Sequence, residues 1–450
     1  MGVCTKLRAH LHHFRRMAWI AASLAIAGVS VWLTPAREAL DGLFIRSLFL
    51  TRGALPAPAD VLVVGIDRPS VQALGLSDDT AHWPRRLHAH AVNQLARAGA
   101  TAIAFDMHFA EPDADDALFA AAVRRAGNVV LFSLLRGEAV VGGYRESLEP
   151  PRAPLAGAAA GTAPFPLPKW PLEVRHCWAF KREAGGVPTL PAVAYQIAAR
   201  ADYARLLPLL PRDAVRSVNA SWPQRMQALR AALSRGAPAP HAADVGLQRL
   251  IDFYTRDDAR LINFYGPPRT IATLPYADVV QGRFSASAIA GKTVFIGLSE
   301  NLEPLQKDGF YTVFSRADGL DLSGVEIAAT AFANFARGES LQAWRGGAQL
   351  LLVGLVALGL ALAIALPGAR GLAALVALLV AGVAAAYGLF VARHTVLPLA
   401  VPLGVQWPLA LAIFAVEHAR RLRQSRSELR AAFAHYLPTQ LLDPTADRSQ

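Results

Sequence analysis

Long apolar runs are the clearest feature of the hydrophobic pattern along this chain. One run covers residues 17–34, and three more, at 348–366, 371–392 and 396–416, follow one another late in the sequence. A helix rises about 1.5 Å per residue, so each run is long enough to cross a hydrocarbon core of about 30 Å. The pattern therefore predicts four transmembrane helices. Three prolines in the last run predict a kink within it.

Basic residues flank these runs unevenly. Residues 1–16 are rich in Lys and Arg, Arg370 lies between the second and third runs, and residues 417–450 include an arginine-rich stretch. By the positive-inside rule, both termini are expected in the cytoplasm and the long segment between the first two runs outside. A cleaved signal peptide is the alternative for the first run, although the run is longer than a usual signal h-region and no small-x-small site follows it.

The outside segment, residues 45–345, shows the alternation of an α/β fold. A continuous apolar strand pattern at 61–66 is followed by a helical pattern at 86–98 and a second strand pattern at 101–105. A helix and a third strand follow, and strand patterns return at 259–267 and 292–298. Such apolar strands are usually parallel and covered by helices on both faces. We expect a mostly parallel sheet with helices on both faces, with residues 140–250 giving the weakest signal.

Composition supports membrane insertion and excludes several classes of protein. Hydrophobic residues make up 53% of the 450 residues and charged residues 18%, below the quarter or so that is typical of soluble domains. The net charge is +11, and arginines cluster beside the apolar runs, which favours cytoplasmic flanks over nucleic-acid binding. Cys4 and Cys177 are too few for a disulfide framework. The sequence contains none of the common cofactor fingerprints, so we expect no cofactor and no catalytic residue.

Acidic residues fall where three predicted strands end. Asp67 and Asp106 directly follow strand patterns, Glu300 ends the segment TVFIGLSE (293–300), and Glu111 and Asp113 come soon after Asp106. Ligands of open parallel sheets bind outside the carboxyl ends of the strands, so these five acids are candidates for an anionic pocket that takes a cation, a metal or an amine. The alternative is that they cap the helices that follow, because negative charge is favoured at a helix N-terminus.

Three histidines lie near these acids. His88 and His90 are two residues apart on a predicted helix, so their side chains point about 200° apart and do not share a metal from one face. We expect both to lie on the helix surface, and His82 precedes the helix.

Several of these segments are similar to one known family. VLVVGIDRPSVQALG (61–75) and the stretch from HWPRRLHAH to ALFAAAV (82–123) resemble the second family of CHASE domains, the cyclase- and histidine-kinase-associated sensory extracellular domains. IAGKTVFIGLSE (289–300) and DGFYTVFSRADGLDLSGVEIAATAFANFARGESL (308–341) resemble its C-terminal half. The resemblance implies an extracytoplasmic sensor in a bacterial inner membrane, with one membrane helix before the domain and usually three after it. The family feeds nucleotide cyclases, histidine kinases or serine/threonine kinases, and its ligands are not established.

The C-terminal tail carries a second resemblance. Leu422, Leu429, Phe433 and Tyr436 lie at spacings of seven, four and three, which predicts one apolar helix face and a short dimeric coiled coil. FAHYLPTQLL (433–442) resembles the F-x-x-Y-x-P segment that precedes class III nucleotide cyclase domains. The alternative is a basic helix lying on anionic lipid.

Three functions remain open at this point. The first is a homodimeric membrane sensor of an unknown extracytoplasmic ligand. The second is the sensor portion of an enzyme, a nucleotide cyclase or a kinase; only a dozen residues follow Pro438, so we expect the chain to stop before any effector domain and to hold no enzyme itself. The third is a tethered binding protein, which the acidic strand ends allow.

Overall fold

The computed structural model describes residues 2–436 apart from 141–142, 169–172, 211–220, 239–243, 301–307, 317 and 345, and it describes side chains from residue 14 to residue 430 outside 139–145 and those gaps. The chain forms two compact units. The α/β unit covers Arg52–Gln342, and the membrane unit contains Met1–Thr51 and Ala343–Gln450.

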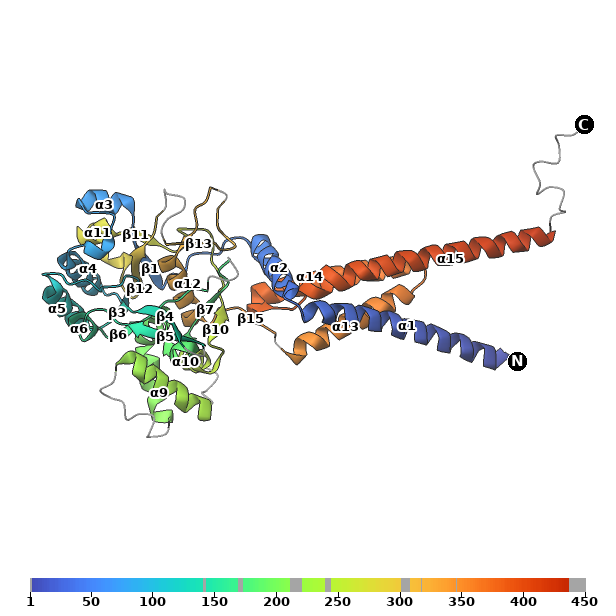
Figure 1. Ribbon diagram of the computed structural model, residues 1–450, viewed down its shortest axis with the longest axis horizontal. Helices are drawn as coiled ribbons and strands as arrows, with labels where there is room; N and C mark the ends of the chain where they lie inside the picture. Colours follow the sequence, from blue (N-terminus) through green and yellow to red (C-terminus); the bar gives the residue numbers. More distant parts are fainter. Residues whose placement is uncertain are drawn as a thin grey trace, which may run out of the picture. The chain divides into compact units, whose positions relative to one another are not determined.

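A parallel six-stranded sheet forms the centre of the α/β unit (Figure 1). Its strands, in spatial order, are β11 (Thr273–Pro275), β1 (Val61–Ile66), β12 (Thr293–Leu298), β2 (Ala102–Phe105), β3 (Val129–Phe132) and β6 (Gly161–Ala163). Every neighbouring pair is parallel. The predicted α/β architecture is therefore confirmed. The apolar pattern of the sequence does not show that β12 lies between β1 and β2, because β12 comes late in the unit.

Helices cover both faces of this sheet. α3 (Arg68–Leu74), α4 (Arg85–Arg97), α5 (Asp116–Ala126) and α11 (Tyr276–Val280) share one apolar core with alternate strand residues such as Val64. On the other face, α7 (Leu190–Ala198) and α12 (Gly324–Arg337) contact the central strands. There, the rings of Phe295 and Phe332 lie 5.7 Å apart. Both faces are apolar because both are buried.

The middle of the unit adds small elements around the sheet. They comprise the hairpin β4 (Leu134–Val140) and β5 (Gly143–Glu149), the pairs β7 (His176–Trp178) with β10 (Ala259–Leu261), β8 (Phe180–Lys181) with β9 (Val187–Pro188) and β13 (Gly309–Phe310) with β14 (Leu322–Ser323), and the helices α6 (Ala153–Ala156), α8 (Arg200–Leu206), α9 (Trp222–Arg235) and α10 (Val245–Thr255). Residues 259–267 were expected to continue the central sheet. That prediction is wrong, because β10 pairs antiparallel with β7 instead.

His88 corrects the expectation of a surface histidine. It is fully buried on α4 and shares a hydrogen bond of 2.8 Å with the Tyr276 hydroxyl. Burial, reinforced by the positive charge of Arg85, lowers the pKa of His88 to about 3, so its ring is neutral at physiological pH. The reason is that α5 and α11 both pack against α4, which buries more than one stripe of that helix. His82 and His90 are exposed.

Among its described residues, the membrane unit contains three helices that are long and apolar enough to span a membrane. They are Phe14–Trp32 within α1 (Gly2–Trp32), α13 (Gly347–Ala365) and α14 (Ala369–Arg393). The prediction of a fourth continuous span at 396–416 is wrong. That run contains a short strand, β16 (Thr395–Val396), then the π-helix η6 (Pro402–Gln406) and only the first third of α15 (Trp407–Tyr436). Prolines disturb the start of the run, and charged residues begin at Glu417.

The chain after α14 nevertheless packs against the candidate spans. The buried Gln406 amide donates hydrogen bonds of 3.1 Å to the carbonyls of Leu24 and Val353, and Arg16 forms an ion pair with Glu417. An added Cβ at Gly28 would lie 2.8 Å from the Gln406 side chain. Such close approach at a small residue is typical of helix packing in membranes. The helix α2 (Ala36–Arg52) follows α1 in the chain.

A buried amide joins α12 to the segment where the chain begins the α/β unit. Asn334 on α12 accepts the backbone N–H of Asn263 at 2.8 Å and donates to its carbonyl at 3.1 Å. Arg52 donates to the Asn263 side chain at 2.6 Å and to the Phe264 carbonyl at 2.5 Å. Asn263 thereby links the last turns of α12 to Arg52, the residue that ends α2.

Replacing this amide should destabilise the α/β unit. We expect Asn334→Ala to lower the free energy of unfolding by about 2–4 kcal/mol, because it removes two hydrogen bonds from a buried backbone. Urea unfolding of the full chain in lipid nanodiscs measures the change. Asn93→Ala is the matched control: its side chain accepts one bond from Arg125 at the surface, and it should change stability by less than about 0.5 kcal/mol. Equal effects of the two variants would contradict the assigned role of Asn334.

Candidate functional site

The predicted acidic residues do share one edge of the sheet. β1, β12 and β2 are neighbours and run parallel, so Asp67, Glu300 and Asp106 follow the same ends of adjacent strands. We call this side, where the parallel strands end, the carboxyl edge. The acids there divide into two groups, one neutralised by the chain itself and one that faces a cavity.

Asp67 and Glu300 belong to the first group. The Asp67 carboxylate caps α3 by accepting the backbone N–H of Ser70 at 3.0 Å, and it lies 3.7 Å from the guanidinium of Arg269. Burial raises the pKa of Glu300, while the backbone N–H of Arg68 and the nearby Arg269 oppose that shift. The capping interpretation thus holds for Asp67, and the cation that these acids require comes from the protein.

Arg269 is held at the carboxyl edge by several bonds. Its guanidinium donates to the Ser299 carbonyl at 2.5 Å, and its backbone N–H donates to Glu326 at 2.6 Å. Its φ of 69° lies in the left-handed region, which is uncommon for a residue with a side chain. The surrounding bonds fix this conformation and hold a positive charge beside Asp67.

Glu111 and Asp113 do not join a pocket. Glu111 is exposed. The Asp113 carboxylate accepts the backbone N–H of Arg85, at 3.3 Å, and the backbone N–H of Asp115, at 2.8 Å. These bonds organise the start of α4 and the turn before α5. The helix-start interpretation therefore describes Asp113 better than the ligand interpretation does.

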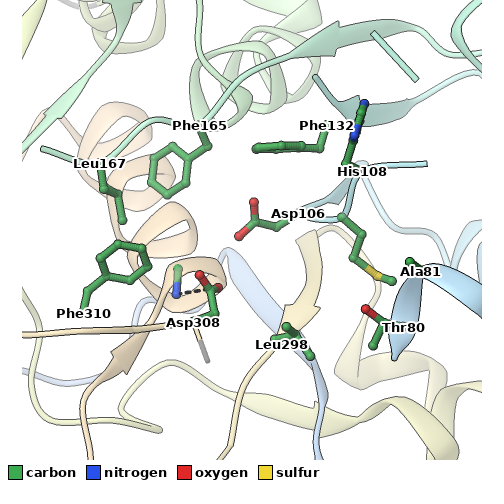
Figure 2. Close-up of a pocket in the computed structure, with 12 residues that line it drawn as sticks. Thr80, Ala81, Asp106, His108, Phe132, Phe165, Leu167, Leu298, Asp308 and Phe310 are labelled. Carbon is green, nitrogen blue, oxygen red and sulfur yellow. Dashed lines mark hydrogen bonds between the residues drawn. The ribbon is translucent and has the colours of Figure 1, made fainter. Parts of the chain in front are cut away.

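Asp106 lines a cavity of about 370 Å³ at the carboxyl edge. This volume lies within the usual range for small-molecule sites, roughly 300–1,000 Å³. The lining comes from the ends of β2, β3 and β12 and from the segments around β6, β13 and α12. The lining residues are Thr80, Ala81, Asp106, Met107, His108, Phe132, Phe165, Leu167, Leu298, Asp308, Phe310 and Gly324 (Figure 2).

Two carboxyl groups face each other across this cavity. Figure 2 shows the side chains of Asp106 and Asp308 pointing into the same space. Burial, reinforced by the negative charge of Asp308, raises the pKa of Asp106 well above its ordinary value. Burial also raises the pKa of Asp308, to about 6, although a hydrogen bond from the Gly324 backbone N–H, 3.2 Å long, opposes the shift. The pair therefore holds protons more tightly than isolated aspartates do.

The remaining walls are aromatic and apolar. Phe132, Phe165 and Phe310 present their rings to the cavity, as Figure 2 shows. His108 lies 6.3 Å from the Phe132 ring, centroid to centroid, and its Nε2 atom is buried without a hydrogen bond from any described residue. The cavity thus combines two carboxyl groups with an aromatic surface.

A metal fits this site poorly. Among the described residues, no group of three or more His, Cys, Asp and Glu side chains is placed to hold a metal ion. Calcium takes six to eight oxygen ligands, and the walls of this cavity supply few oxygens beyond the two carboxyls. An organic ligand suits the lining better.

Asp308 is the site residue that sequence reasoning missed. It begins the segment DGFYTVF (308–314) and follows no strand pattern. Its position depends on β12 entering the sheet beside β2, since that order brings residues after β12 close to Asp106. The acidic DG pair was the only local signal.

Comparison with known proteins gives one match. The sequence model of the CHASE2 domain matches residues 19–364 of the chain. No curated protein and no solved structure matches it.

The carboxyl pair should make stability depend on pH. The pKa of Asp308 is about 6 in the folded chain and about 3.9 when unfolded, so the folded state binds more protons in this window and its stability falls as pH rises from about 4 to 6. We expect Asp308→Asn to be more stable than the wild type at pH 7, by about 1–2 kcal/mol, and to lose this gain near pH 4.

Urea unfolding of the full chain in nanodiscs at both pH values measures this difference. Asp78→Asn, at an exposed position, serves as the control and should leave stability unchanged. A loss of stability in Asp308→Asn at pH 7 equal to that at pH 4 would show that Asp308 acts only through its bond to Gly324.

Proposed function

Because the chain belongs to the CHASE2 domain family, we propose that it is a membrane receptor whose α/β unit senses an extracytoplasmic stimulus. The receptor passes the signal through its membrane helices to a cytoplasmic effector, which we propose is a nucleotide cyclase. A CHASE2 sensory domain joined to candidate membrane spans supports the first part of this proposal. The resemblance of residues 433–442 to a cyclase linker supports the second.

In this proposal both termini lie in the cytoplasm, and the chain crosses back between Arg393 and Glu417 as a broken segment of β16, η6 and the start of α15 rather than as one continuous span. The arginine-rich flanks support it through the positive-inside rule. A contact within the membrane unit supports it independently: Arg16, at the start of the first candidate span, forms an ion pair with Glu417 on α15. The two residues therefore lie at the same end of the helix bundle. The α/β unit then lies outside, in the extracytoplasmic space of a bacterial inner membrane.

Helix α12 is the observation that carries the proposal. Its first residue, Gly324, lines the cavity, and Asn334, near its other end, is hydrogen-bonded to Asn263, which binds Arg52. Twelve of its fourteen residues are buried, so we expect a displacement of one end of α12 to move the whole helix. The chain reaches the next candidate span, at Gly347, soon after α12 ends. A change at the cavity thus has a direct mechanical route to both connections with the membrane.

A stimulus has to satisfy one physical condition to use this route. It has to bind one arrangement of the receptor more tightly than another, because equal affinity shifts no equilibrium. Differences of 5- to 150-fold are typical of allosteric coupling.

The tail supports a paired output. α15 continues as a helix to Tyr436, and Leu422 and Leu429 are about half exposed, at 50% and 55%. Within the single chain these apolar side chains are not covered. The side chains of Phe433 and Tyr436 lie outside the described residues. We propose that two copies pair along this face, as short coiled coils do.

If the helical tail transmits the signal, the output of a fused cyclase should depend on the rotational position at which the tail presents it. We fuse the chain, after Tyr436, to a nucleotide cyclase catalytic domain and insert one to seven alanines between Arg430 and Ala431. Cyclic nucleotide formation in membranes should vary with a period of about 3.5 residues, by at least about fivefold, and return at seven inserted residues. Output that is independent of insertion length would favour a tethered binding protein over a transmitting receptor.

Pairing of the tail should be visible by disulfide crosslinking. In a Cys4→Ser, Cys177→Ser background, Leu429→Cys should crosslink between copies in oxidised membranes. Ser427→Cys, two residues away on the opposite side of the helix, should crosslink several-fold less. Equal yields at both positions would rule out a defined apolar seam.

A further inference from the structure

We propose that the cavity between Asp106 and Asp308 binds an organic monocation, an ammonium group on a small aromatic or aliphatic body. This inference rests on the proposed sensor function, because it names the class of stimulus that the α/β unit takes. The charge and the walls of the cavity each support it.

The charge of the cavity fits a positively charged ligand. Asp106 and Asp308 line the same cavity, and the negative charge of Asp308 adds to the cost of ionising Asp106. At Asp67, the matching charge comes from Arg269. At Asp106, no described residue supplies a hydrogen bond or an ion pair to the carboxyl group. Asp106 is half-buried, and a carboxylate that is withdrawn from water without a partner is costly, so a bound cation removes that cost.

The walls of the cavity select the rest of the ligand. The rings of Phe132, Phe165 and Phe310 line it together with Leu167 and Leu298. An ammonium group near an aromatic face gains about 0.5–2 kcal/mol from the ring quadrupole, and an apolar body is removed from water against the same rings. Inorganic cations gain nothing from apolar walls, and they lose their hydration shell without enough oxygen ligands to replace it.

His108 contributes a further ring to the lining of the cavity. Its ring lies beside Phe132, with the centroids 6.3 Å apart. Its Nε2 atom is buried, so that atom is not open to the cavity.

The position of the cavity allows ligand binding to act on helix α12. Asp308 accepts the backbone N–H of Gly324 at the start of α12. An ammonium group that draws the Asp308 carboxylate toward the cavity competes with this bond. Ligand binding therefore acts on the N-terminus of the helix whose other end is hydrogen-bonded to Asn263.

Calorimetric titration of the full chain in nanodiscs tests the ligand class. The probe is phenethylammonium, and phenethyl alcohol is its neutral counterpart with the same carbon skeleton. We expect saturable binding of phenethylammonium at pH 7.5 and at least tenfold weaker binding of phenethyl alcohol. Asp106→Asn should lower the affinity for phenethylammonium at least tenfold, and Phe165→Leu should weaken it severalfold. Glu111→Gln, at an exposed acid outside the cavity, should leave it unchanged.

Lower pH should weaken binding, because protons compete with the ligand for the carboxyls. Among the described lining residues the titratable groups are Asp106, His108 and Asp308. Affinity should fall severalfold between pH 7.5 and 5 in the wild type and much less in Asp308→Asn. An equal fall in both proteins would overturn the assigned role of this pair.

Other outcomes separate this inference from the sensor proposal. Absence of phenethylammonium binding, equal binding of the alcohol, or saturable binding of calcium alone would overturn the ligand class. None of these results affects the alanine-insertion experiment, which uses no ligand. Binding that meets every expectation but leaves the output of the cyclase fusion unchanged would instead overturn the sensory role of the cavity.

Discussion

Carboxyl groups at the carboxyl edge of the parallel sheet have to be neutralised, and the arrangement of the site depends on this constraint. Apolar strands bring Asp67, Glu300 and Asp106 to one edge, where water is scarce and charge is costly. The chain resolves this in two ways. Arg269 and a helix cap satisfy Asp67, whereas Asp106 and Asp308 have raised pKa values and face a cavity. The carboxyl pair that no cation of the described residues neutralises lies where a ligand can reach it, and such perturbed groups cluster at functional sites.

Helix α12 connects this electrostatic feature to the rest of the receptor. Its N-terminal end is bonded to Asp308 and its C-terminal turns to Asn263. Because it is packed along nearly its whole length against the sheet and α7, a displacement at one end is not absorbed by loose side chains on the way. The packing that stabilises the α/β unit therefore also allows a change at the cavity to reach the other end of α12. In the membrane unit, Gln406 plays a comparable joining role, since its amide bonds to carbonyls of two neighbouring helices.

Local patterns in the sequence predicted individual strands and helices, but they did not predict which of these elements are neighbours in the fold. The strands ending at Ile66 and Phe105 and the helix predicted at 86–98 were all legible from apolar periodicity, because each buries its own side chains. The insertion of β12 between β1 and β2 depends on pairs such as Val61 with Thr293 and Ala102 with Thr293, which are far apart in the sequence, and periodicity does not encode such contacts. For that reason Asp106 was a candidate from the start, and its partner Asp308 was not. The same limit applied to His88, whose burial follows from two helices packing on α4, and to residues 396–416, where prolines replace a continuous span with a π-helix.

Burial raises the pKa of Asp106 and Asp308 in the folded chain, and the proposed ligand and its pH dependence rest on this shift. Infrared spectroscopy of the full chain in nanodiscs measures it directly, because protonated and ionised carboxyl groups absorb at different frequencies. At pH 5.5, which is below the pKa of about 6 of Asp308 and above that of an isolated aspartate, the wild type should show a protonated-carboxyl band that is weaker in Asp308→Asn. Phenethylammonium should shift or weaken that band. A wild-type spectrum at pH 5.5 that is identical to that of Asp308→Asn in the protonated-carboxyl region would contradict the raised pKa of this pair.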